Sequence, residues 1–445
     1  ANGGAVGLIT TTRVVYISDN QRINLVYNRH LYERKADGTH YTLGEIQMKT
    51  KQARAVSGSE DKNDLNFILL GDPALRLAYP DANKIIVDSI NGIAPGSDET
   101  AQMKAGSTTK VKGHIETFDG SRLTDFNGRI ETTAMDSKKL VTSLNNAGYV
   151  YDDGPDTIQF MARTNTLFIG NDSIRNGEFE MEFAVPLDIN YSNESGLLNF
   201  YAWNDSVEAN AEFDDFIVGG AVEDINTDGI GPDIYAYLNT PDFVYGGRVN
   251  ESPVLYASFM DEDGMNISES GLGHNIVAII DDDPNQTYVL NDYYTQAGNY
   301  RYGNVVYKLS GLSAGRHKMK IRAWDVFNNS SSTTLEFEVV TGLKPSLTAV
   351  NCISPATEQT TFFVTNDRPE SDVTVMLEVF DYAGGVLFKT EVEDQTTSGI
   401  YTYDWDLRDN AGAPFKSGVY IYRISMSADG GEYESKTGKI VIIRQ

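Results

Sequence analysis

Cysteine is nearly absent from this chain of 445 residues, since Cys352 is the only one. One thiol forms neither an internal disulfide nor a cysteine-ligated zinc cluster, so the sequence excludes both. Long apolar runs are lacking too. Runs such as residues 67–70 are far shorter than the roughly 20 residues that a helix needs to cross a bilayer. We therefore predict no transmembrane segment.

Basic residues are scarce as well. Lys and Arg number 36 against 63 Asp and Glu, which gives a formal net charge of −27. This excess of negative charge repels nucleic-acid phosphates, and no Lys/Arg-rich run offsets it, so we predict no nucleic-acid partner. The basic and apolar pattern of a signal peptide does not follow Ala1, and we expect a trimmed N-terminus.

Glycine and tyrosine are abundant, with 40 Gly and 25 Tyr. Together with many Thr, Ser, Asn and Asp, they favour short strands joined by turns over long helices. Hydrophobic residues make up 40% of the chain, which suffices for several cores. At roughly 150 residues per domain, the length predicts three or four domains. The fold class that we predict is mainly β.

The opening segment differs from the rest. Residues 5–9 form a short apolar run typical of strands buried on both faces, and we expect an interior parallel strand there. Helical patterns follow at about 19–34 and 43–55, and Thr42 with Glu45 can form a capping box at the start of the second helix. This pattern predicts only a fraction of an α/β domain, which we assign to residues 1–83.

Downstream of this segment, short alternating stretches separated by Gly, Asn and Asp predict strands. They fall into three blocks, at residues 84–220, 221–343 and 344–445, which we assign to three β-sandwiches of immunoglobulin-like type. The first two blocks share a similar late segment, each followed by a polar loop and a final strand, at residues 199–204 and 320–325. This similarity suggests a duplicated module.

Three pieces of the opening segment, residues 3–8, 43–45 and 67–77, carry a family resemblance. The third piece, Phe-Ile-Leu-Leu-Gly-Asp-Pro-Ala-Leu-Arg-Leu, is the most specific. Together they resemble the end of the gingipain-type cysteine peptidase domain, which has a caspase-like α/β fold. The resemblance implies a catalytic histidine and cysteine located before the matching strand. His30, His40 and Cys352 all lie after it, so we assign no catalytic and no cofactor-binding residue, and activity of this chain stays open.

Residues 271–276, 290–294 and 323–330 resemble the surface sortases of the type IX secretion system within that family. Such an enzyme removes the C-terminal signal domain from exported cargo at the outer membrane and attaches the cargo to the cell surface. The resemblance implies protein cargo and an outer-membrane secretion protein as partners, and a peripheral location on the extracellular side. Residues 405–412 and 419–423 are similar to the immunoglobulin-like domain of the flagellar hook-cap protein.

The best local motif for ligand binding lies between the first two blocks. Oxygen-bearing side chains at alternate positions before a glycine are how a calcium loop begins. The candidate ligands of a structural calcium ion are Asp224, Asn226, Asp228 and Asp233. The Glu that closes an EF-hand loop is missing, and Asx turns in a linker explain the same residues. We expect no required cofactor.

Other chemistry-bearing residues have simpler explanations. The acidic runs at 261–263 and 281–283 precede Gly or Pro, and we expect solvated turns there rather than paired catalytic carboxylates. For His274, in a glycine-rich loop, we expect hydrogen bonds to the backbone. For Cys352 we expect a partly buried structural thiol.

Two further functions stay open beside the sortase interpretation. A cell-surface adhesin or glycan-binding array requires exposed aromatic platforms, and Tyr293, Tyr294 and Tyr300 are the residues to examine for it. A secreted gingipain-like cargo protease would lose residues 344–445 on export. We favour the sortase interpretation, because the resemblance continues through both middle blocks.

Overall fold

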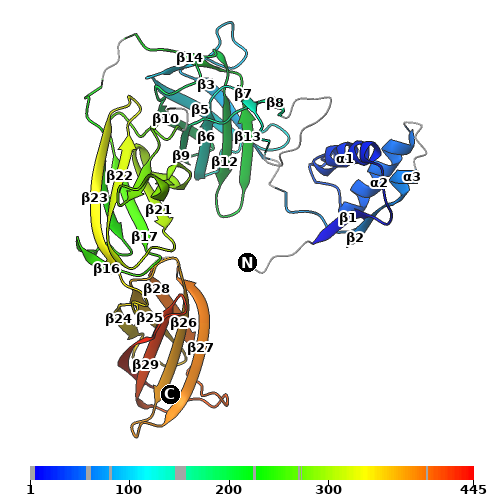
Figure 1. Ribbon diagram of the computed structural model, residues 1–445. Helices are drawn as coiled ribbons and strands as arrows, with labels where there is room; N and C mark the ends of the chain where they lie inside the picture. The colour runs from blue at the N-terminus through cyan, green and yellow to red at the C-terminus, as the bar shows by residue number, and fades with distance from the viewer. Residues whose placement is uncertain are drawn as a thin grey trace.

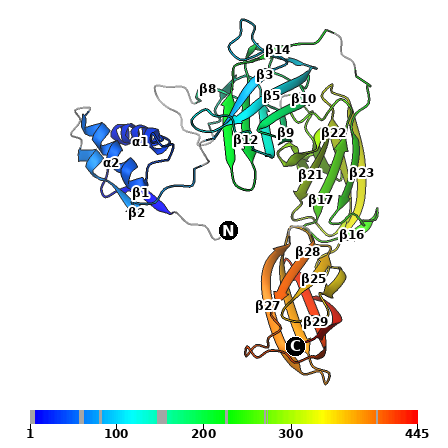
Figure 2. The ribbon, with the colours of Figure 1, turned by 180° about the vertical axis from the view of Figure 1, so that it is seen from behind.

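The computed structural model describes residues 6–56, 62–79, 83–145, 157–223, 227–268, 271, 273–396 and 399–444. Figures 1 and 2 show a small helical unit at the N-terminal end of the chain and three units built of strands. We call the latter the first (83–221), second (233–339) and third (347–442) β-domains. The fold is mainly β, as the composition predicted.

Two strands and three helices make up the N-terminal unit. They are β1 (Gly7–Thr11), α1 (Ile17–Leu31), α2 (Leu43–Val56), α3 (Lys62–Leu65) and β2 (Phe67–Gly71). The predicted capping box of α2 is confirmed, because the Thr42 amide donates to Glu45 Oε2 at 2.8 Å and the Glu45 amide donates to Thr42 Oγ1 at 3.3 Å. This reciprocal pair fixes the start of α2.

The first strand differs from its prediction. β1 pairs antiparallel with β2, and no other described strand joins this sheet. Leu8 stands opposite Leu70, and these side chains are 53% and 51% exposed. The expected interior parallel strand was therefore wrong, because an apolar run predicts burial but specifies neither the partner strand nor its direction.

The first β-domain contains a seven-stranded sheet and a three-stranded sheet, with strand orders β10-β5-β3-β13-β12-β6-β9 and β11-β14-β4. Its strands, including the separate pair β7 and β8, are β3 (Asn83–Ile90), β4 (Gln102–Ala105), β5 (Thr108–Glu116), β6 (Gly128–Met135), β7 (Lys139–Thr142), β8 (Gln159–Ala162), β9 (Thr166–Ile174), β10 (Glu178–Ala184), β11 (Glu194–Ser195), β12 (Leu197–Trp203), β13 (Glu208–Phe213) and β14 (Ile217–Ala221).

Alternation along β10 shows why these residues form strands. Phe179, Met181 and Phe183 are buried in the core. Glu180 points outward, and its carboxylate forms an ion pair with Lys112 Nζ at 2.7 Å. A strand with one apolar and one charged face fits a sheet that covers a core on one side. Both sheets of the first β-domain contribute side chains to one hydrophobic core.

The second β-domain pairs a four-stranded sheet, β15-β17-β21-β20, with a five-stranded sheet, β16-β23-β22-β18-β19. Its elements are β15 (Asp233–Leu238), β16 (Gly247–Val249), β17 (Val254–Met260), β18 (Val277–Ile280), η1 (Pro284–Gln286), β19 (Thr287–Val289), η2 (Asn291–Tyr293), β20 (Tyr294–Ala297), β21 (Asn299–Lys308), β22 (Gly315–Trp324) and β23 (Ser330–Val339). Both sheets bury side chains in one core of their own.

The third β-domain has a three-stranded sheet, β24-β25-β28, and a four-stranded sheet, β27-β26-β29-β30. Its strands are β24 (Leu347–Cys352), β25 (Thr360–Asn366), β26 (Ser371–Phe380), β27 (Val386–Thr396), β28 (Ile400–Trp405), β29 (Gly418–Ala428) and β30 (Glu434–Ile442). Its core includes the aromatic side chains of Phe362, Trp405 and Tyr422.

Asp188, which follows β10, joins the first β-domain to the second. Its carboxylate accepts hydrogen bonds from Asn266 Nδ2 at 3.0 Å and Asn328 Nδ2 at 3.1 Å, and it lies 2.5 Å from His274 Nδ1. All three partners belong to the second β-domain. The expected backbone partners of the His274 ring were therefore wrong, because its partner is a carboxylate 86 residues away in the chain.

Among the described residues, no helix combines the length and the apolar character that crossing a bilayer requires.

Candidate functional site

The structure describes two of the four predicted calcium ligands. Asp224 and Asn226 lie outside the described residues. Asp233 begins β15 and stands opposite Met260 of β17. The Asp228 amide lies 3.4 Å from Asp263 Oδ2, and the neighbouring Thr227 hydroxyl donates to the same oxygen at 2.9 Å. The predicted loop therefore meets a carboxylate that the sequence motif did not include.

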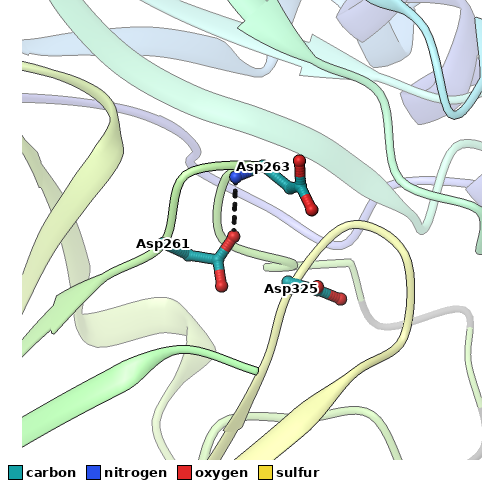
Figure 3. A group of neighbouring side chains, drawn as sticks. All are labelled: Asp261, Asp263 and Asp325. Carbon is teal, nitrogen blue, oxygen red and sulfur yellow. Dashed lines mark hydrogen bonds between the residues drawn. The ribbon is translucent and has the colours of Figure 1, made fainter. Parts of the chain in front are cut away.

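Asp263 belongs to a group of three aspartates, with Asp261 and Asp325 (Figure 3). One carboxylate oxygen from each residue lies within 4.8 Å of the others. Asp261 and Asp263 follow β17, and Asp325 follows β22, so each sheet of the second β-domain contributes. A bridge between Met265 and Asp325 holds the two loops together. We call these three residues the aspartate cluster.

Backbone amides orient the two buried carboxylates of the cluster. Asp261 Oδ1 accepts from the amides of Asp263 at 2.8 Å and Gly264 at 3.0 Å. Asp325 Oδ1 accepts from the Asn329 amide at 2.7 Å, and Asp325 Oδ2 accepts from Asn329 Nδ2 at 2.7 Å. These bonds position both side chains before any ligand is present.

Burial governs the charge of the cluster. Asp261 is 6% exposed, and this burial raises its pKa to about 7. Repulsion from Asp325 and Asp263 adds to the rise, whereas hydrogen bonds from backbone amides lower the pKa and offset part of it. Burial also raises the pKa of Asp325, which is fully buried. The predicted solvated turn at 261–263 was therefore wrong for Asp261, because its turn packs against the loop after β22.

Three carboxylates that share one location suit a hard cation. Ca²⁺ takes oxygen ligands from Asp, Glu and carbonyl groups, and its charge would relieve the repulsion within the aspartate cluster. Sequence reasoning missed this grouping because Asp261 and Asp325 are 64 positions apart. A weak signal existed, since Asp325 is the last residue of the segment 320–325, whose sequence resembles residues 199–204.

Cys352 and the three tyrosines that the sequence singled out do not gather into a site within the described part of the chain. Cys352 is half-buried, and burial raises the pKa of its thiol, which disfavours the nucleophilic thiolate. Tyr294 is buried in the core of the second β-domain, and Tyr293 packs edge-on against Tyr307. Tyr300 packs against the core of the first β-domain. These three tyrosines therefore do not form an aromatic platform.

Comparisons with known proteins agree with the family resemblance. The model of peptidase family C25 matches residues 1–78. The crystal structure of dimeric latent PorU from Porphyromonas gingivalis is 29% identical over 99% of this chain, with a TM-score of 0.41. The chain covers 41% of the PorU chain. No curated protein sequence shows significant similarity.

Two other solved structures are similar at low identity. A bacterial ice-binding adhesin of 1.5 MDa is 12% identical, with a TM-score of 0.17, over 82% of this chain and 99% of its own. The FN1–FN3 domains of chicken CNTN1 are 12% identical, with a TM-score of 0.17, over 81% of this chain and 98% of their own. Neither likeness supports a functional conclusion. Residues 1–78 thus carry the relationship to peptidase family C25, the gingipain family, and the chain that they begin is similar to PorU.

Proposed function

We propose that this chain is the C-terminal region of a cell-surface sortase of the type IX secretion system. The observation that carries the proposal is the small unit of two strands and three helices at residues 7–71, which lies within the segment that matches peptidase family C25. The remainder of that peptidase domain would supply the catalytic histidine and cysteine. The complete peptidase domain would then cleave the signal domain from the cargo and attach the cargo to the cell surface.

The exposed apolar surface of the N-terminal unit supports this proposal. Leu8 and Leu70 stand opposite each other in a two-stranded sheet that no further strand of the described residues joins at either edge. Further exposed apolar side chains of the unit are those of Val14, Tyr16, Ile17, Leu25 and Leu65. Apolar side chains and unpaired strand edges gathered in so small a unit favour the addition of further strands and helices.

The three β-domains take the supporting roles in this proposal. They would hold the peptidase domain at the extracellular side of the outer membrane, as a peripheral assembly, and dock both the cargo signal domain and an outer-membrane secretion protein. The acidic composition suits protein partners better than anionic polymers. A secreted cargo protease is the alternative, and it differs by the loss of residues 344–445 after export.

The test uses the protein from its native host, isolated through a tag inserted at the exposed turn beside Tyr382. We expect an intact mass larger than that of this chain, retention of residues 344–445, and labelling of one cysteine by a peptidyl chloromethyl ketone. In the matched control, Cys352→Ser, both the labelling and the processing of cargo signal domains should persist. Labelling of Cys352 itself, or loss of residues 344–445 in the mature protein, would contradict the proposal.

We also propose that a structural calcium ion binds where the loop at 227–228 meets the aspartate cluster. In this proposal Asp228 and Asp263 complete the oxygen ligands around Asp261 and Asp325. Thermal unfolding in EDTA and in 1 mM CaCl₂ tests it. A ligand at about 100 times its Kd adds about 2.7 kcal/mol of stability, so the second β-domain should melt several degrees higher in calcium.

The variant Asp263→Asn removes one charge from the cluster and should abolish the calcium-dependent shift. Asp98→Asn, at an exposed carboxylate of the first β-domain, is the matched control and should keep the shift. An equal melting temperature with and without calcium in the unmodified chain would refute the metal site. The sortase proposal would be unaffected by that result.

A further inference from the structure

The outer face of the four-stranded sheet in the second β-domain carries several aromatic side chains. Tyr237 of β15 stands opposite Tyr256 of β17, and their rings stack with centroids 5.1 Å apart. Tyr235 is 62% exposed, and Tyr302 of β21 is exposed opposite Met260. Side chains at alternate positions share one side of a sheet, so these five form one surface. We call it the tyrosine face.

Two hollows open along the tyrosine face. A hollow of about 470 Å³ lies over Tyr235, Met260 and Tyr302. A second hollow, of about 660 Å³, begins at Tyr237 and Tyr256 and continues onto the end of the third β-domain, where Ile400 lines it. Both volumes fall in the range of ligand sites. Their lining residues together run along the sheet from β15 and β17 to the third β-domain. Figure 1 shows the second and third β-domains next to each other in the ribbon.

The rim of the tyrosine face is negatively charged. The carboxylates of Asp233, Asp242 and Glu370 line the two hollows, and none of the described lining residues is Lys, Arg or His. Within the described part of the chain, no ion pair involves these three carboxylates. The adjacent Lys308 donates to the Glu370 carbonyl at 2.6 Å and forms its ion pair with Asp429, at 3.8 Å, rather than with the Glu370 carboxylate. The surface therefore favours a positively charged ligand.

We infer that the tyrosine face binds an extended peptide segment in which Lys or Arg alternates with apolar residues. The basic side chains pair with Asp233, Asp242 and Glu370, and the exposed ring of Tyr235 offers a cation–π contact. The apolar side chains pack on Met260 and Ile400. A segment of about five extended residues covers the three alternate rows of the sheet, and the residues that follow it reach the junction with the third β-domain.

Other occupants fit the face less well. A second copy of this chain brings a further charge of −27 toward three carboxylates. A neutral glycan leaves those carboxylates without a compensating charge, and the stacked rings of Tyr237 and Tyr256 cover each other and reduce the ring area open to it. The inference rests on the second and third β-domains alone and does not require the sortase role.

Fluorescence anisotropy with the full chain tests the inference. The probe is a fluorescein-labelled peptide, Gly-Arg-Val-Lys-Val-Arg-Gly, and the matched control carries Glu in place of each basic residue. We expect binding of the basic peptide at least about tenfold tighter than that of the acidic one. The affinity should fall when NaCl is raised from 50 to 500 mM, because salt screens exposed charges.

Two variants locate the site. Neutralising the rim with Asp233→Asn, Asp242→Asn and Glu370→Gln should weaken binding of the basic peptide roughly tenfold, since exposed ion pairs contribute modestly one by one. Tyr235→Ala with Tyr302→Ala should weaken it several-fold. The matched control, Tyr382→Ala, removes a tyrosine that is 88% exposed in the third β-domain and should leave the affinity unchanged.

Each outcome decides the question. Loss of affinity in both the rim and the tyrosine variants, with Tyr382→Ala unaffected, supports the peptide site. Equal affinity for the basic and acidic peptides, or unchanged affinity in the rim variant, overturns it. Competition by the neutral oligosaccharide maltohexaose would overturn it in favour of a glycan site. Because all the substituted side chains are exposed or line the hollows, their loss leaves the cores intact, and circular dichroism verifies this.

Discussion

Replacing Phe362 by Ala should unfold the third β-domain at a much lower temperature while the other two β-domains melt as before. The Phe362 ring is fully buried and packs edge-on against Tyr422, with ring centroids 5.0 Å apart. It also lies 6.1 Å from the Trp405 ring. Removing a buried phenylalanine side chain costs about 3–5 kcal/mol, because it loses apolar burial and leaves a cavity. For a domain of this size the melting temperature should fall by more than about 10 °C.

Differential scanning calorimetry, with hydrogen exchange to assign each transition, measures this effect. The third β-domain has a hydrophobic core whose residues are separate from those of the other two, so its transition should move alone. The exposed Tyr382→Ala in the same domain is the control and should shift the transition by less than about 2 °C. A common shift of all transitions after Phe362→Ala would show that the three β-domains unfold as one unit.

The second large effect is a pH dependence set by Asp261. Burial raises the pKa of this carboxyl to about 7 in the folded chain, against an ordinary value of 3.8. Between these values the folded state holds a proton that the unfolded state releases. Stability of the second β-domain should therefore be highest near pH 4 and fall as the pH rises toward 7. Three pKa units correspond to at most about 4 kcal/mol.

Asp261→Asn removes the titrating group and should flatten this decline. Urea unfolding at pH 4, 5.5 and 7, in EDTA to exclude divalent cations, measures the slope. Some slope should persist, because burial raises the pKa of Asp325 as well. Asp98→Asn, at an exposed carboxylate, should reproduce the slope of the unmodified chain. An identical decline in Asp261→Asn would mean that other groups cause it.

Local patterns allowed much of this fold to be predicted from the sequence. The Thr42 and Glu45 capping box follows from a short-range spacing, and the alternation of Phe179, Glu180 and Met181 follows from the period of a strand. The antiparallel partner of β1 could not be predicted in this way, because strand direction depends on residues more than fifty positions away.

For the candidate sites, too, only the features that depend on neighbouring residues could be predicted. Asp228 was found because neighbouring residues carried a ligand spacing, whereas Asp261 and Asp325 become neighbours only when two sheets of one domain come together. The partner of His274 is Asp188 of the first β-domain, so no local sequence pattern could predict the contact. Tyr293, Tyr294 and Tyr300 were the tyrosines to examine for an aromatic platform, but Tyr294 is buried against Phe259 and Tyr293 packs against Tyr307. The exposed tyrosines that gather on one sheet face, Tyr235 and Tyr302, are set by strand register, which no local pattern predicts.

The parallel pairing of β3 with β13 limits the order in which the first β-domain assembles. Ala209 of β13 pairs with Asn83 of β3, although more than 120 residues separate them in the chain. During synthesis, β3 can pair with β13 only after the ribosome has made β13. Closing so long a loop also slows folding. The hairpin of β29 with β30 needs no such wait, since both strands emerge together. Until β13 has been synthesised, one edge of β3 stays unpaired and can mispair with other strands. This interval is when a chaperone can bind the exposed edge of β3.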